Sequence, residues 1–71
     1  MAKTKPFLAQ QTLKLLRAGS GKTQQQMAEY LGISGNNYTQ KENGWLEFSI
    51  SECGKIMELF KKAFDGIFLT N

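Results

Sequence analysis

The sequence predicts an all-α fold. Apolar residues recur at spacings of three and four along most of the chain, which is the period of a helix with one buried face. The chain contains no valine and a single proline. At 71 residues it can form only one small domain, whose stability depends on a compact core.

The first helix is expected at about residues 7–18. Pro6 fits the first turn of a helix, where its missing N–H is not needed, and Gly19 with Gly21 ends the segment. The expected apolar face comprises Leu8, Ala9, Leu13, Leu15 and Leu16.

The second helix is expected to begin at Thr23 and to stop at Gly32. Thr23 and Gln26 have the spacing of a capping box, in which each side chain bonds the backbone N–H of the other residue. Glycine then ends the helix because it adopts left-handed backbone angles easily. The expected buried stripe comprises Met27, Ala28 and Leu31.

A third short helix is expected at about residues 35–42, only three residues after the second. Ser34 can cap its first turn, and Asn43-Gly44 can end it. Two short helices are thus expected in close succession.

A fourth helix is expected to begin at Ser49, which forms a second capping box with Glu52. Its apolar face would comprise Ile50, Cys53, Ile56, Met57 and Phe60. Asp65 can cap a last short turn carrying Ile67, Phe68 and Leu69, which makes five helical segments. The side chains expected in the core are Leu13, Leu16, Met27, Ala28, Leu31, Ile33, Tyr38, Ile56 and Phe60.

The first third of the chain is its basic end. The net charge is +3, and no acidic residue accompanies the basic residues of the first 22 positions, which are Lys3, Lys5, Lys14, Arg17 and Lys22. Clustered basic side chains suit a polyanionic partner, because neutralising phosphates releases counterions. A net charge of this size is also common among proteins that bind nothing acidic.

Composition argues against several kinds of chemistry. Without histidine, and with Cys53 as the only cysteine, the chain cannot form a zinc site, a Cys–His pair or an internal disulfide. AGSGKT at 18–23 ends like a phosphate-binding loop, but Leu16 stands where that motif requires glycine. We therefore expect no enzyme, no metal and no cofactor. No apolar run reaches the roughly 18 residues of a membrane span, and we expect a cytoplasmic protein.

The third expected helix is unusual for its amide side chains. If Tyr38 faces the core, Asn36 and Gln40 lie within about 20° of the opposite, outward direction. Asn37 and Thr39 flank them. Asn and Gln can bond both N6 and N7 of adenine, and Thr can contact the methyl group of thymine. These residues are predicted to read base edges, although four such residues taken alone more often form a plain exposed polar helix.

Two short helices joined by a three-residue turn, with amides outward on the second, are typical of a DNA-binding helix-turn-helix. From Leu13 to Phe68 the sequence resembles the phage repressor helix-turn-helix family of the Cro/CI or XRE type. The resemblance lies in TQxxxAxxLGIS, residues 23–34, followed eight residues later by ENG, and in Arg17. It implies a compact five-helix lambda-repressor-like domain over 1–71, with 1–6 as a flexible basic arm, that binds operator DNA as a homodimer.

The resemblance also implies roles for individual residues. Arg17 and Glu42 would form a structural ion pair between the first and third helices. The expected base contacts are Asn36, Asn37, Thr39 and Gln40. The resemblance implies that Gln24 holds a phosphate. Lys41 departs from the family, which usually has an apolar residue there, but its stem can lie along the core and send its ammonium toward a phosphate. Thr23, Gln25 and Asn43 complete the expected phosphate contacts.

The sequence departs from the family in several places. Gly35 stands where the family often has a long polar side chain at the head of the recognition helix, which removes one expected contact. Trp45-Leu46-Glu47-Phe48 replaces a basic stretch, so these residues either pack inside or meet a partner. Lys61-Lys62 replaces the residues that end the fourth helix, which is therefore expected to run a turn longer.

We expect a sequence-specific DNA-binding transcription regulator, a small Cro-like repressor controlled by its own concentration rather than by a second domain. The dimer surface is expected at Ile67-Phe68-Leu69 with part of the fourth helix. The alternative is a protein-interaction module that keeps the fold without binding DNA. Gly35, Trp45-Leu46 and the modest net charge favour that alternative.

Overall fold

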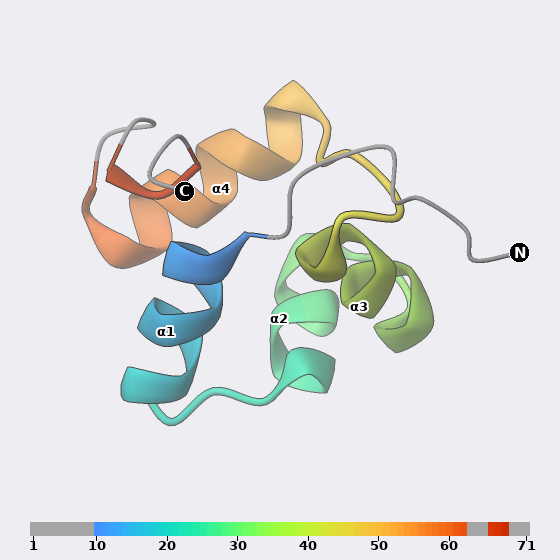
Figure 1. The fold of residues 1–71 in the computed structure, drawn as a ribbon, viewed down its shortest axis with the longest axis horizontal. Helices are drawn as coiled ribbons and strands as arrows, with labels where there is room; N and C mark the ends of the chain where they lie inside the picture. Colours follow the sequence, from blue (N-terminus) through green and yellow to red (C-terminus); the bar gives the residue numbers. More distant parts are fainter. Residues whose placement is uncertain (1–9, 63–65, 69–71) are drawn as a thin grey trace, which may run out of the picture.

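The computed structural model describes residues 10–62 and 66–68. These residues form four α-helices and no strand, which confirms the all-α prediction for them. The helices are α1 (Gln11–Gly19), α2 (Gln24–Leu31), α3 (Gly35–Asn43) and α4 (Ile50–Phe60). In Figure 1, α2 and α3 pack together in one half of the molecule, and α1 and α4 occupy the other half. None of the helices in the described residues is long and apolar enough to cross a membrane.

Helix α1 begins later than expected. Gln10 has non-helical backbone angles (φ −89°, ψ 76°), and its N–H donates to the carbonyl of Glu42 at 2.9 Å. This bond holds residue 10 against the last turn of α3, so the helix starts only at Gln11. The expected start of the helix at about residue 7 and the expected arm at 1–6 lie outside the described residues. Leu15 was wrongly assigned to the apolar face: it is 73% exposed, because it points away from the side that buries Leu13.

The two short helices begin and end at the expected residues. The Thr23 hydroxyl accepts the N–H of Gln26 at 3.0 Å, and the Gln26 carbonyl oxygen accepts the N–H of Thr23 at 2.9 Å. Ser34 caps α3 by accepting the N–H of Asn37 at 3.0 Å. Gly32 takes the left-handed conformation (φ 76°), which turns the chain between the two helices within three residues.

Helix α4 has the predicted capping box between Ser49 and Glu52, but two expectations about it are wrong. Ile50 is 94% exposed, because the buried face of the helix centres on Ile56 and Ile50 points elsewhere. The helix also does not run a turn longer, since Lys61 adopts left-handed angles (φ 56°) and ends it.

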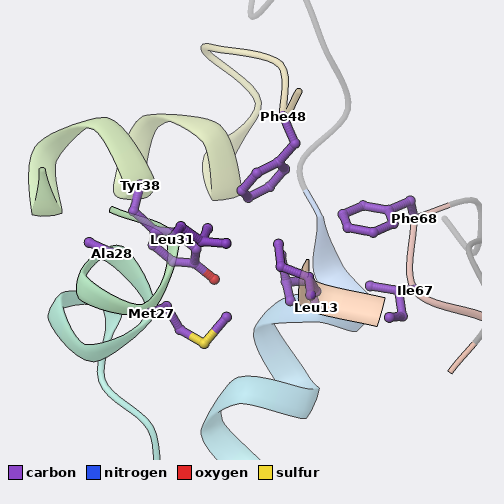
Figure 2. Close-up of a cluster of buried hydrophobic side chains, with 9 residues drawn as sticks. Leu13, Met27, Ala28, Leu31, Tyr38, Phe48, Ile67 and Phe68 are labelled. Atoms are coloured by element: carbon purple, nitrogen blue, oxygen red, sulfur yellow. The ribbon is translucent and has the colours of Figure 1, made fainter. Parts of the chain in front are cut away.

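The described residues hold four helices rather than five. Gly66, Ile67 and Phe68 form only a short turn, while Asp65 and Leu69 lie outside the described residues. The core contains Leu13, Met27, Ala28, Leu31, Tyr38, Phe48, Ile56, Ile67 and Phe68 (Figure 2). Leu16, Ile33 and Phe60, expected to be buried, are partly buried at its edge.

Aromatic rings join the halves of the core. The ring of Phe48 packs edge-on against those of Tyr38 and Phe68, with centroids 5.8 Å apart in both pairs. Ile67 is 1% exposed and Phe68 is 7% exposed. These two side chains are buried inside a single copy, so they do not form part of an exposed dimer surface as expected, and Leu69 lies outside the described residues.

Candidate nucleic-acid interface

The inner face of α3 is held by a buried carboxylate. Glu42 is fully buried and accepts hydrogen bonds at both oxygens. Its Oε2 accepts from Nε of Arg17 at 2.9 Å and from the Tyr38 hydroxyl at 2.8 Å. Its Oε1 accepts from Nε2 of Gln24 at 3.0 Å, with Nη2 of Arg17 at 3.4 Å. Arg17 and Glu42 thus form an ion pair that ties α1 to α3.

Hydrogen bonding keeps this carboxylate charged. Burial alone would raise the pKa of Glu42, but hydrogen bonds from Arg17, Gln24 and Tyr38 and the charge of Arg17 outweigh burial and lower the pKa below its usual value. Burial and the bond to Glu42 raise the pKa of Tyr38 far above its usual value, so its hydroxyl stays a donor. The inner face of α3 therefore has a fixed charge state near neutral pH.

Gln24 lies between α2 and this network. Its Nε2 donates to Glu42, and its Oε1 accepts from the Thr39 hydroxyl at 3.1 Å. One Nε2 hydrogen remains for an external partner. Thr39 was expected to contact a base. Its hydroxyl hydrogen is donated to Gln24, so its methyl group is the part of the side chain left for a contact with a base. The sequence carried no local signal for these bonds, because the partners are 15 and 18 residues apart.

Lys41 was expected to reach a phosphate, but its ammonium is engaged elsewhere. Its Nζ lies 2.6 and 2.8 Å from the two carboxylate oxygens of Glu52, and only 12% of the Lys41 side chain is exposed. Burial would raise the pKa of Glu52, but bonds from Lys41 and Ser49 lower it. This pair joins α3 to the start of α4, so the structure gives Lys41 a role between helices.

The outer face of α3 carries the remaining candidate base contacts. Asn36 is exposed, in line with its expected outward direction. Gln40 is half-buried and lines a shallow hollow of about 550 Å³ together with Thr39, Asn43 and Trp45. The carbonyl of Gln40 accepts the N–H groups of Trp45 at 2.8 Å and Leu46 at 3.2 Å, which places the loop beside this hollow.

Two Asn residues beside this face have side-chain oxygens that are buried or already hydrogen-bonded within the domain. The Oδ1 atom of Asn37 is buried and has no hydrogen-bond partner in the described residues, so only part of this side chain is available to a base. Oδ1 of Asn43, an expected phosphate contact, accepts from Nζ of Lys14 at 3.2 Å. The amide nitrogen of Asn43 is the group left to contact an anion.

At the N-terminal end of α2, Thr23 and Gln25 are exposed. The Thr23 hydroxyl already accepts a capping bond, so it can offer its hydrogen to an external acceptor. Gln25 extends along α2 toward Glu29, to which its Nε2 donates at 3.5 Å. Both remain candidates for contacts outside the chain.

The residues of the loop after α3 were expected either to pack inside or to meet a partner, and they differ in burial. Phe48 packs into the core and is 9% exposed, whereas Trp45 is 37% and Leu46 is 40% exposed. The outer surface therefore combines amides on α3 with apolar side chains in the following loop.

No protein-family model matches this chain, and no curated protein is significantly similar to it.

Proposed function

We propose that this chain is a sequence-specific DNA-binding transcription regulator, a small Cro-like repressor of the Cro/CI or XRE type. In this proposal α2 and α3 form the helix-turn-helix of a lambda-repressor-like domain. Helix α3 enters the major groove, and the N-terminal end of α2 approaches the phosphate backbone.

The observation that carries the proposal is the contrast between the two faces of α3. Tyr38 and Glu42 are fully buried on its inner face. Asn36 is exposed on the outer face, and Gln40 lines the hollow there. A nine-residue helix whose outward side chains are amides suits the reading of adenine, whose N6 donates while N7 accepts.

The inner-face bonds support a rigid presentation of these amides. Glu42 joins α1, α2 and α3 through Arg17, Gln24 and Tyr38, and Lys41 joins α3 to α4. Because the helix is fixed in this way, the backbone positions from which its side chains reach the bases are well defined. For phosphate contacts we retain Thr23, Asn43 and the remaining Nε2 hydrogen of Gln24.

We further propose that two copies bind one operator. A helix of nine residues reaches only a few base pairs, and a two-fold operator lets two recognition helices read half-sites one turn of DNA apart. Sedimentation of the protein with a two-half-site duplex should show two copies per duplex.

A protein-interaction module is the second candidate. It is favoured by apolar side chains near the start of α4 and in the preceding loop: Ile50 is 94%, Leu46 is 40% and Trp45 is 37% exposed. Exposed apolar groups of this kind are typical of surfaces that meet another protein.

The test is to select bound duplexes from a random pool and measure affinity for the enriched sequence. Asn36→Ala and Gln40→Ala should each reduce that affinity by about 1–3 kcal/mol, relax preference at one or two positions, and change affinity for random DNA little. Ser51→Ala is the matched control, because Ser51 is an exposed polar residue on α4, away from the proposed reading face.

The outcomes separate the two candidates. A protein that enriches no sequence and shows no affinity for DNA is the result expected of the interaction module. Losses that are equal on enriched and random DNA would mean that Asn36 and Gln40 hold the backbone and that α3 does not read bases.

A further inference from the structure

Gly35, the first residue of α3, makes room for a side chain from α2. A Cβ atom built at Gly35 would overlap Oε1 of Gln25 and would lie 3.5 Å from its Cδ. The Gln25 amide therefore occupies the space that the beginning of a side chain at position 35 would fill. Only glycine allows it to lie there unchanged.

The two neighbouring glutamines of α2 differ in burial and in hydrogen bonding. Gln24 is half-buried and uses both ends of its amide inside the fold, with Glu42 and Thr39. Gln25 is exposed, and within the described residues its side chain makes a single hydrogen bond, the 3.5 Å contact with Glu29, at the limit of hydrogen-bond length. Gln25 thus retains nearly all of its donor and acceptor capacity.

The position of the Gln25 amide is next to the proposed reading residues. Gly35 directly precedes Asn36 in α3, and both Gln25 and Asn36 are exposed. Two amides, one from each helix, are therefore presented at the head of α3. Each has the donor and acceptor needed for the N6 and N7 atoms of adenine.

We propose that Gln25 is a base-reading residue that supplies, from α2, the contact that Gly35 cannot make from α3. It determines the sequence preference at one end of the half-site, and adenine is the base that its amide matches. This assignment rests on the proposed function. It moves Gln25 from the phosphate contacts expected from sequence to the base contacts.

Two substitutions on different helices test the assignment. Gln25→Ala removes the amide, and Gly35→Ala displaces it by placing a methyl group in its space. Because the displaced atom is the end of a flexible side chain, Gly35→Ala should leave the thermal unfolding midpoint no lower than that of the wild type. Gly54→Ala is the matched control: Gly54 lies in α4, and a Cβ there meets no atom within 4 Å.

Selection from a random duplex pool is carried out with the wild type, both single variants, the double variant and the control. Gln25→Ala should lower affinity for the preferred sequence about five- to tenfold, relax preference at one base pair and leave affinity for random DNA unchanged. Gly35→Ala should alter preference at the same base pair. The double variant should match Gln25→Ala, because no amide remains to be displaced.

Three results would overturn the assignment while leaving the proposed function in place. These are an unchanged preference in Gln25→Ala, equal weakening on preferred and random DNA, and changes at different base pairs for the two substitutions. If the wild type itself enriches no sequence, the proposed function and this assignment are both wrong.

Discussion

Replacing Arg17 by methionine should destabilise the domain through Glu42. The fully buried carboxylate would keep hydrogen bonds from Gln24 and Tyr38 but lose its only cationic partner in the described residues. Removing one member of a buried ion pair costs about 3–5 kcal/mol. The Arg17 side chain is 15% exposed, so we expect the low end, about 3 kcal/mol. A domain of 71 residues has a total stability of roughly 4–10 kcal/mol, so the variant should fold with a much reduced margin.

The penalty should depend on pH in a direction that identifies its cause. In the wild type the pKa of Glu42 is lower in the folded than in the unfolded state. Its carboxylate therefore stabilises the fold at pH values above the unfolded pKa, and this stabilisation is lost as pH falls through the folded pKa. Without the guanidinium, we expect burial to outweigh the remaining bonds from Gln24 and Tyr38 and to raise the folded pKa of Glu42 above its unfolded value. In the variant, the Glu42 carboxyl then stabilises the fold at pH values below its unfolded pKa. This stabilisation is lost as pH rises through the folded pKa. The difference in unfolding free energy between Arg17→Met and wild type should therefore be larger at pH 7 than at about pH 4.

The assay is urea unfolding followed by circular dichroism for the wild type, Arg17→Met, Glu42→Gln and the double variant. The double variant should lose less than the sum of the single losses, because each single change leaves a buried group without its partner. Single losses that add to within about 0.5 kcal/mol would refute the coupling. A penalty for Arg17→Met that is equal at both pH values would refute the role of Glu42 burial.

Two further predictions concern residues whose roles changed with the structure. Lys41→Met should cost about 1–2 kcal/mol in urea unfolding, because it removes charged hydrogen bonds to Glu52. It should leave the slope of log affinity against log salt unchanged for DNA, whereas loss of a phosphate contact would reduce that slope by about 0.9. Lys61→Gly should raise the thermal unfolding midpoint, since Lys61 has left-handed angles (φ 56°) that cost a residue with a side chain about 1 kcal/mol. An unchanged or lower midpoint would contradict the proposed strain.

Local signals in the sequence predicted the described helices well. The capping boxes at Thr23 and Ser49, the cap at Ser34 and the turn at Gly32 all occur as expected. Each of these features depends on hydrogen bonds between residues only three or four positions apart. Both partners can therefore be recognised in one short stretch of sequence. The outward direction of Asn36 follows likewise from the helical period and from one assumption, that Tyr38 is buried.

The faces of the outer helices were less predictable. Leu15 and Ile50 fit an apolar pattern yet are 73% and 94% exposed. Ile67 and Phe68 were expected to meet a second copy but are buried within the domain. The spacing of apolar residues predicts that a helix has an apolar face, but the packing of the other elements decides which part of that face is buried.

The candidate nucleic-acid interface depends on contacts between helices. Gln24 meets Glu42, Lys41 meets Glu52, and Gln25 overlies Gly35, although each pair belongs to different helices. By itself the sequence determined where α2 and α3 begin and end and that α3 carries amides, because those features depend on neighbouring residues. Only the tertiary structure decided which polar groups are used internally and which are left for a ligand, because partners distant in sequence compete for the same donors and acceptors.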